Sequence, residues 1–220
     1  MKLFIDTANT EEIKIASDLK VISGVTTNPT LLMKSGKKLN DLANEILQLI
    51  DGPISVEVSE ADEQTMFNQA MEIYEITNHN KNIVIKLPMT EDGLKVCRKL
   101  YDYEIKTNVT LVFTLNQAIL AMEAKATYIS PFMGRLDDYM KNMNAGFELI
   151  KSIREYRSLH PNITTKIIAA SIRHLLHVEK AARAGADVAT VPFEVLKLMY
   201  THELTTKGLE TFRKDEGKWK

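Results

Sequence analysis

The chain has 220 residues, which suits one domain or at most two small ones, and its formal net charge at pH 7 is −1. This balance excludes a global attraction to nucleic acid or anionic lipid, and no apolar run is long enough for a membrane-spanning helix. Hydrophobic residues make up 45% of the chain and charged residues 26%, as in ordinary globular proteins. We therefore expect neither a nucleic acid nor a membrane as a partner.

The cysteine content and the first residues predict the cellular compartment. Cys97 is the only cysteine, so no intramolecular disulfide can form, and a reducing cytoplasm is the natural location. The opening run "MKLFIDTANTEE" reaches Asp6 too early for a signal peptide. We expect a cytoplasmic protein.

Short β-rich runs alternate with longer amphipathic segments along the whole chain. In chain order, the candidate strands are residues 3–6, 21–26, 54–58, 83–88, 107–112, 127–132, 166–171 and 188–192. Between them, residues 63–77, 91–103 and 143–160 show the apolar periodicity of helices. Eight strands, each followed by a helix, predict an α/β fold of the (β/α)8 TIM barrel type in a single domain, residues 1–220.

An open, doubly wound sheet is the alternative architecture. It normally uses fewer strands, and no glycine-rich dinucleotide fingerprint follows the first strand here. Beyond the eighth unit, the pattern predicts an extra C-terminal helix, with residues 203–220 as an oligomerisation helix or tail. This helix can pack either on its own barrel or on a neighbouring subunit.

One strand carries a lysine inside an apolar run. Lys86 stands in "NIVIKLPMT" among isoleucine, valine and leucine, and Pro88 ends the run. Burying an unpaired lysine costs several kcal/mol, so an exposed lysine on an edge strand is the simpler interpretation of this segment alone. Its meaning depends on what the other strands place nearby.

Side chains alternate along a strand, so the polar residues can be assigned to one face. Barrel enzymes place their chemistry at the carboxyl ends of the strands. The polar phases of six strands, together with Asn28 after the second strand, point there: Asp6, Asn28, Glu57, Lys86, Asn108, Thr110, Ser130 and Ser171. Phe132 shares the face of Ser130, and Arg173 shares the face of Ser171. Each could be a solvated strand end, but a lysine converging with two carboxylates favours function.

A buried lysine between carboxylates is a candidate Schiff-base nucleophile. An unperturbed lysine has a pKa near ~10.4, so about one molecule in a thousand is free amine at neutral pH. Desolvation would lower the pKa of Lys86, whereas the carboxylates Asp6 and Glu57 would raise it. Their distances from Lys86 are therefore critical.

The sequence resembles the transaldolase family, in its small, fructose-6-phosphate-aldolase-like branch. The resemblance spans nearly the whole chain and rests on "FIDTA", "GVTTNPTLL", "ISVEV", "IVIKLPMT", "NVTLVF", "YISPFMGRLDD", "AAS-R" and "VPFEVL". It implies a (β/α)8 barrel that forms a lysine Schiff base and needs no metal or other cofactor. Small members of this family commonly assemble as decamers of two pentamers, with the C-terminal helix reaching a neighbour, so the resemblance implies a homo-oligomer.

The matching positions imply roles. Lys86 resembles the Schiff-base lysine and Asp6 the acid/base of carbon–carbon cleavage. Glu57, through a water held with Thr110, resembles the proton shuttle of carbinolamine dehydration. Two further groups are implied for substrate binding: Asn28, Asn108 and Ser130 for the dihydroxyacetone unit, and Arg135, Ser171 and Arg173 for the phosphate of a sugar phosphate. Arginine suits a phosphate because its planar fork donates bidentate, charge-assisted hydrogen bonds.

The resemblance leads to a transaldolase of the pentose phosphate pathway. It would move a dihydroxyacetone unit from sedoheptulose 7-phosphate or fructose 6-phosphate to glyceraldehyde 3-phosphate or erythrose 4-phosphate. Transaldolases carry phenylalanine and glutamate where Phe132 and Glu57 stand, whereas the aldolase branch tends to have tyrosine and glutamine. A fructose-6-phosphate aldolase that releases dihydroxyacetone stays an alternative, as does a non-catalytic barrel that binds sugar phosphates.

Two departures from the family pattern and one discarded site complete the sequence picture. The segment "YMKNMNAGF" lacks the glycine-rich, histidine-bearing loop expected there, which affects substrate preference, and "THELT" lacks the usual proline. His174 and His177 have a spacing compatible with two ligands on one helix face, but no third ligand is near in the sequence, so no metal site is expected.

Overall fold

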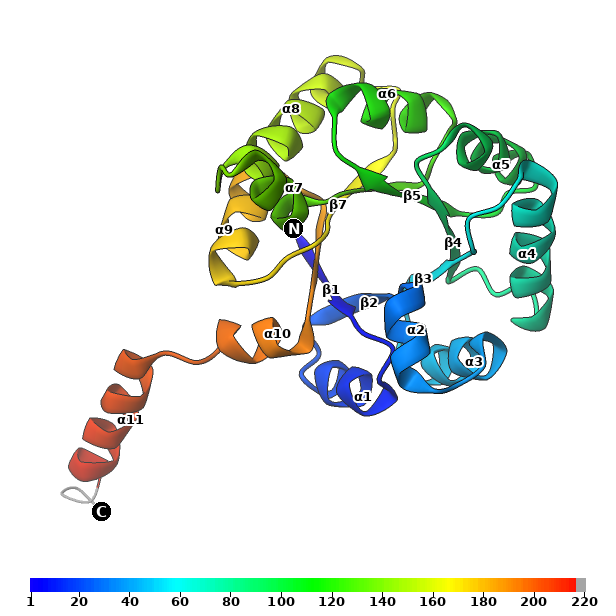
Figure 1. The fold of residues 1–220 in the computed structure, drawn as a ribbon. Helices are drawn as coiled ribbons and strands as arrows, with labels where there is room; N and C mark the ends of the chain where they lie inside the picture. The colour runs from blue at the N-terminus through cyan, green and yellow to red at the C-terminus, as the bar shows by residue number, and fades with distance from the viewer. Residues whose placement is uncertain (217–220) are drawn as a thin grey trace.

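The structure is a computed structural model that describes residues 1–216. Its eight strands close into one barrel in which every neighbouring pair is parallel and follows chain order (Figure 1). The strands are β1 Lys2–Asp6, β2 Ile22–Thr26, β3 Ile54–Glu57, β4 Ile83–Pro88, β5 Thr107–Val112, β6 Tyr128–Pro131, β7 Lys166–Ala169 and β8 Val188–Val191. The predicted (β/α)8 TIM barrel is confirmed, and each predicted strand overlaps an observed one.

Helices surround the barrel and cover the outward face of its strands (Figure 1). They are α1 Thr10–Asp18, α2 Pro29–Ser35, α3 Leu39–Leu49, α4 Glu63–Ile76, α5 Glu91–Asp102, α6 Leu115–Glu123, α7 Met133–Met140, α8 Ala145–Leu159, α9 Leu175–Ala184, α10 Phe193–Met199 and α11 Glu203–Glu216. Short helices α2 and α7 stand between a strand and its main covering helix. They therefore begin directly at the carboxyl ends of β2 and β6.

Polar caps fix where the helices start beside the barrel mouth. Asn28, Thr90 and Thr114 each accept a hydrogen bond from a backbone N–H of the first turn of α2, α5 and α6. Such caps satisfy backbone donors that have no partner within the helix. The loops at the mouth are therefore held by their own side chains.

Side chains that point inward from alternate positions of the strands fill the barrel interior in two layers. An apolar layer closes the amino-terminal side and consists of Phe4, Val84, Tyr128, Ile168 and Val188. The residues two positions further along the same strands are Asp6, Lys86, Ser130, Ala170 and Thr190. Gly24 of β2 leaves room for the first layer, since a Cβ there would lie 2.7 Å from the Phe4 ring. The apolar layer thus forms a floor beneath the polar one.

The last helix, α11, leaves the barrel. None of its residues is buried, and it projects away from the other helices (Figure 1). Leu204 and Phe212 are about seven-tenths exposed, at 70% and 71%. The predicted extra helix is therefore present, and the structure does not pack it on its own barrel. Residues 217–220 of the predicted tail lie outside the described residues.

Candidate active site

Lys86 is buried and paired, not exposed on an edge. Its side chain enters the barrel from β4, and the residue is only 5% exposed. Its Nζ lies 2.8 Å from Glu57 Oε2 and donates a hydrogen bond of 3.0 Å to the carbonyl oxygen of Thr27. The strand register sets this pair, because Glu57 of β3 lies directly beside Lys86. The interpretation as an exposed edge lysine is wrong.

Asp6 ends β1 on the other side of the same space. The Thr26 hydroxyl donates a 2.7 Å hydrogen bond to Asp6 Oδ1. Burial raises the pKa of the Asp6 carboxyl, while the Thr26 hydrogen bond and the Lys86 charge lower it in part. Asp6 therefore holds a proton more readily than a carboxyl group in water does.

A buried amide and two hydroxyls line the barrel between β3 and β6. Ser130 Oγ donates a 2.8 Å hydrogen bond to Asn108 Oδ1, and Asn108 Nδ2 donates a 3.2 Å hydrogen bond to Ser55 Oγ. Asn108 is fully buried and does not line the cavity, whereas its hydrogen-bond partner Ser130 does. Thr110 differs, because its buried hydroxyl has no hydrogen-bond partner within the described residues.

Asn28 has a divided role at the mouth. Its Oδ1 accepts a 3.0 Å hydrogen bond from the Leu31 backbone N–H and so caps α2. This leaves the amide NH₂ group of Asn28, which lines the cavity, as a donor for a ligand.

A cavity of about 170 Å³ gathers these side chains. Its lining comprises Asp6, Thr26, Asn28, Lys86, Thr110, Ser130, Phe132, Arg135, Ala170, Ser171 and Thr190. Glu57 lies outside this lining, in a neighbouring pocket with Asn28, and its ion pair with Lys86 connects it to the cavity. The cavity is large enough for a small, hydroxyl-rich group next to the lysine.

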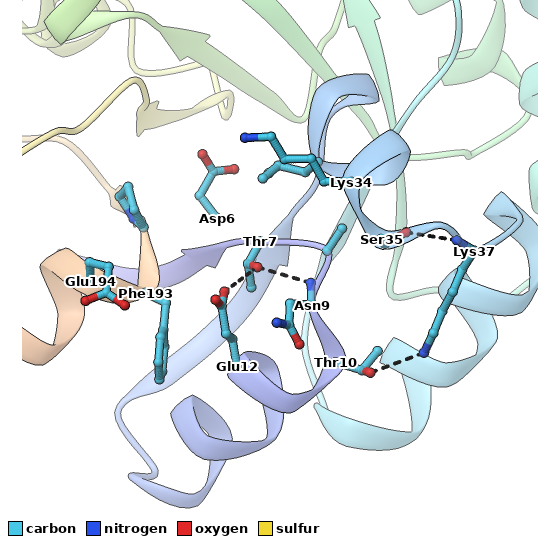
Figure 2. Close-up of a pocket in the computed structure, with 13 residues that line it drawn as sticks. Asp6, Thr7, Asn9, Thr10, Glu12, Lys34, Ser35, Lys37, Phe193 and Glu194 are labelled. Atoms are coloured by element: carbon cyan, nitrogen blue, oxygen red, sulfur yellow. Dashed lines mark hydrogen bonds between the residues drawn. The ribbon is translucent and has the colours of Figure 1, made fainter.

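Asp6 also borders a larger outer pocket of about 540 Å³ between α1, α2 and the start of α10. Figure 2 shows Lys34 reaching from α2 toward Asp6, with Thr7 and Glu12 joined by a hydrogen bond below them. The barrel mouth therefore opens toward polar side chains on this side.

The two predicted phosphate-binding arginines have different surroundings. Arg135 lines the cavity, and its guanidinium carbon stands 5.1 Å from the centre of the Phe132 ring. The guanidinium of Arg173 forms an exposed ion pair with Asp138 and does not line the cavity. The structure thus brings Arg135, but not Arg173, to the site.

Ser171 reaches the cavity for a different reason than strand alternation. Strand β7 ends at Ala169, and its inward-pointing positions are Ile168 and Ala170. Alternation therefore does not point Ser171 inward, contrary to the prediction. The backbone of Ser171 then adopts a left-handed conformation, with φ of 58°. Its hydroxyl accepts a 3.2 Å hydrogen bond from the backbone N–H of Arg135, so Ser171 stays beside Arg135.

Glycine at position 134 allows this close contact. The Gly134 N–H donates a 3.1 Å hydrogen bond to the Ser171 carbonyl, and a Cβ at Gly134 would lie 2.4 Å from that oxygen. Any other residue would push α7 away from the end of β7. Gly134 therefore helps to hold Arg135 at the cavity edge.

His174 and His177, whose spacing suggested metal ligands, hold local structure. His177 Nδ1 accepts a 3.2 Å hydrogen bond from the backbone N–H of Arg173, and His177 Nε2 lies 3.2 Å from Asp137 Oδ2. His174 caps α9 by accepting from the His177 N–H. Both ring nitrogens of His177 are therefore used within the protein. Residues 1–216 contain no group of three side chains arranged to hold a metal ion.

Sequence reasoning missed Thr26 and Thr190. Both line the cavity, and their hydroxyl oxygens lie 2.6 Å apart. The alternation that selected Lys86 and Ser130 also selects Thr190, two positions after the inward Val188. Alternation thus places Thr190 on the inward face, but a threonine in a strand is also a common β-branched residue with no chemical role.

A sequence model described as Transaldolase/Fructose-6-phosphate aldolase matches residues 3–219. A protein of Caldicellulosiruptor saccharolyticus named "Probable transaldolase" is 53% identical over 215 residues, covering 98% of this chain and 96% of its own. A protein of the same name from Thermodesulfovibrio yellowstonii is 51% identical over 220 residues, covering all of both chains.

Among solved structures, orotidine 5′-monophosphate decarboxylase from Metallosphaera sedula superposes with a TM-score of 0.59 at 16% identity, covering 98% of each chain. This likeness shows the barrel fold alone. No helix among residues 1–216 has both the length and the apolar character needed to cross a membrane. The family match and the near-complete relatives carry the identification: this chain belongs to the transaldolase/fructose-6-phosphate aldolase family.

Proposed function

We propose that the chain is a transaldolase that transfers a dihydroxyacetone unit from a ketose phosphate to an aldose phosphate through a Schiff base on Lys86. The observation that carries this proposal is the buried Lys86 amine, 2.8 Å from Glu57 and facing a cavity that Asp6 also lines. Sedoheptulose 7-phosphate or fructose 6-phosphate would be the donor. Glyceraldehyde 3-phosphate or erythrose 4-phosphate would be the acceptor, as in the pentose phosphate pathway of the cytoplasm.

Formation of the Schiff base needs a proton carrier beside the lysine. The Lys86 amine adds to the ketone carbon C2 of the substrate and forms a carbinolamine, which then loses water to give the iminium. Glu57 lies close enough to take a proton from Nζ and return it to the departing hydroxyl. The free hydroxyl of Thr110 suits a bridging water for this transfer, because it has no protein partner among the described residues.

Cleavage then depends on Asp6. The carboxylate takes the proton of the C4 hydroxyl, the C3–C4 bond breaks, and its electron pair enters the iminium to give an enamine. An aldehyde leaves, and the three-carbon enamine stays bound. The enamine carbon then attacks the acceptor aldehyde, and Asp6 returns the proton to the new hydroxyl. Asn28 and Ser130 are placed in the cavity lining where hydroxyls of the three-carbon unit can bind.

The proposal is tested by borohydride reduction in the presence of fructose 6-phosphate. Reduction of the iminium fixes the three-carbon unit on the protein, and the intact mass should rise by one dihydroxyacetone-derived adduct per chain. A non-catalytic barrel that binds sugar phosphates would give no adduct. The matched control for non-specific glycation is a chain that has already been reduced once with fructose 6-phosphate. A second treatment with fructose 6-phosphate and borohydride should add no further mass.

The phosphate site gives a prediction about Arg135. Arg135→Ala should lower kcat/KM for erythrose 4-phosphate by about 10- to 100-fold, the worth of a lost charge-assisted hydrogen bond, and should change little for unphosphorylated aldehydes. Arg173→Ala should cost less, because Arg173 is paired with Asp138. Arg98→Ala, at an exposed ion pair on α5, is the matched control and should have no effect. Equal losses for both acceptor types would make Arg135 a structural residue.

Phe132 gives a prediction about transfer against release. Its ring lines the cavity, packs edge-on against Phe113 at 5.8 Å, and carries no proton to give. Phe132→Tyr adds a hydroxyl that can protonate the enamine or orient a water. General acid help of this kind is worth about 10²-fold when well aligned, so release of free dihydroxyacetone should rise relative to transfer.

Both products can be assayed in one reaction with fructose 6-phosphate and erythrose 4-phosphate. Phe113→Tyr is the matched control, because Phe113 borders a different pocket and not the cavity. An unchanged ratio in Phe132→Tyr, with turnover retained, would mean that other residues separate this chain from a stand-alone aldolase.

We also propose that the chain forms a large homo-oligomer in which α11 lies between subunits. The support is the unburied α11 with its exposed Leu204 and Phe212. An apolar pocket bordered by Leu136, Tyr139 and Met140 lies on the barrel between α7 and α8, where a helix of a second copy would fit. A chain ending at His202 should sediment as a smaller particle while keeping its circular dichroism. An unchanged particle size would remove α11 from the interface.

A further inference from the structure

We propose that Thr190 is a positioning residue that acts on Asp6 through Thr26, so that Oδ2 of Asp6 is the atom that exchanges a proton with the substrate. The inference rests on the proposed function, because it concerns the proton step of carbon–carbon cleavage. It concerns a strand, β8, that supplies none of the residues to which the sequence pattern assigned chemistry.

Three side chains from three adjacent strands form one chain of hydrogen bonds. The Thr190 and Thr26 hydroxyl oxygens are 2.6 Å apart, and Thr26 Oγ1 is 2.7 Å from Asp6 Oδ1. Thr26 is 2% exposed and Thr190 is 3% exposed. The barrel register aligns them, since Asp6 lies beside Thr26 and β8 pairs with β1 on the other side.

The direction of the hydrogen bonds follows from the number of protons. An ionised Asp6 can only accept, so Thr26 must give its single hydroxyl proton to Asp6 Oδ1. Thr26 then has no proton for Thr190, and the short contact between the two hydroxyls requires Thr190 to donate to Thr26. Thr190 is the first donor of the chain, and Asp6 Oδ1 is the last acceptor.

This direction makes the two oxygens of Asp6 inequivalent. A proton arriving on Oδ1 would force both hydroxyls to reverse, whereas a proton arriving on Oδ2 leaves them undisturbed. Asp6 borders the cavity, so its second oxygen is available to the substrate hydroxyl. Because a hydroxyl that accepts a hydrogen bond becomes a better donor, Thr190 also strengthens the contact that stabilises the Asp6 carboxylate.

The Thr190 hydroxyl has no other hydrogen-bond partner in residues 1–216. A buried hydroxyl is costly unless it is bonded, and valine would fill the same space on this apolar strand. The neighbouring Val188 and Val191 are both valines. Thr190 therefore carries a hydroxyl whose single use is the contact with Thr26.

The experiment is a double-mutant cycle of Thr190→Val and Thr26→Val, measured on retro-aldol cleavage and on borohydride trapping. Thr190→Val should lower kcat/KM for cleavage about three- to tenfold, while the total yield of adduct trapped on Lys86, six-carbon and three-carbon together, is unchanged. If Thr190 acts through Thr26, Thr190→Val should cause no further loss in a Thr26→Val background. Thr190→Ser keeps the hydroxyl and should recover most of the activity.

A pH profile gives a readout that a packing defect would not move. Loss of the Thr190 hydroxyl weakens the stabilisation of the Asp6 carboxylate, so the pKa of Asp6 should rise and the acid limb of kcat/KM should shift to higher pH. The charged groups that surround Asp6 are unchanged by the substitution. Lys86 of β4 and Glu57 of β3 act on Asp6 through their charges, and Arg135 of α7 lines the same cavity. Glu12 of α1, Lys34 of α2, Lys37 and Glu194 of α10 line the outer pocket that Asp6 borders.

Thr107→Val is the matched control. Thr107 is a buried strand threonine, but its hydroxyl faces Cys97 of α5 outside the barrel interior. This variant should leave the acid limb in place. Additive losses in the cycle, an unmoved acid limb, or equal loss of trapping and cleavage in Thr190→Val would each overturn the inference. Absence of trapping in the unmodified protein would instead overturn the proposed function, so the two failures are distinguishable.

Discussion

Replacing Lys86 with methionine should abolish borohydride-dependent labelling and lower transfer by at least about 10³-fold, as loss of the nucleophile does in other covalent enzymes. Methionine fills a similar volume without the amine, so the barrel is expected to stay folded. Intact mass after reduction with fructose 6-phosphate measures the labelling. Labelling that persists in Lys86→Met would assign the nucleophile to another lysine.

The same substitution has a stability cost that the structure predicts. Without the ammonium, the Glu57 carboxylate, 14% exposed, loses its ion-pair partner. Removing one partner of a buried pair costs about 3–5 kcal/mol. The double variant Lys86→Met with Glu57→Gln removes both charges. Its melting temperature should rise most of the way back to that of the unmodified protein, while activity stays lost. A double variant no more stable than Lys86→Met would mean that Glu57 is well solvated without the lysine.

Asp6→Asn should separate Schiff-base formation from cleavage. The asparagine cannot take the C4 hydroxyl proton, so cleavage should fall by about 10²- to 10⁴-fold, the typical contribution of a general base. Lys86 and Glu57 are untouched, so the imine should still form, and reduction should now fix the whole six-carbon fructose 6-phosphate on the chain instead of the three-carbon unit. Mass spectrometry of the adduct and a coupled assay of the released aldehyde measure the two steps. Equal loss of both would place Asp6 in imine formation.

The pKa of Asp6 also sets the pH dependence of stability. Burial raises this pKa above its ordinary value of 3.8, so the folded protein binds the proton more tightly than the unfolded chain. The ionised carboxyl therefore costs stability at neutral pH, and that cost disappears as the pH falls below the ordinary value. Asp6→Asn should melt at a higher temperature than the unmodified protein at pH 7, with the difference closing toward about pH 4. A difference independent of pH would exclude burial of the charge as its cause.

The sequence by itself determined the barrel and most of the residues that face its cavity. Alternation along a strand is a local property with a period of two, so Asp6, Lys86 and Ser130 could be assigned to the inward face without knowing any neighbour. Strand number and the helices between strands then favoured the barrel over an open, doubly wound sheet. Motif resemblance supplied roles for the residues but no distances.

Tertiary structure decided which of these residues touch. The Glu57–Lys86 pair depends on the register between β3 and β4, and the contact of Thr26 with Thr190 joins residues 164 positions apart across the closure of the barrel. Arg173 belongs to the same motif as Ser171, yet its long side chain forms an ion pair with Asp138 on α7. No local sequence pattern predicts this contact. Local periodicity fixes where a side chain points, whereas the partner it meets depends on strand register and helix packing, which are set by contacts distant in sequence.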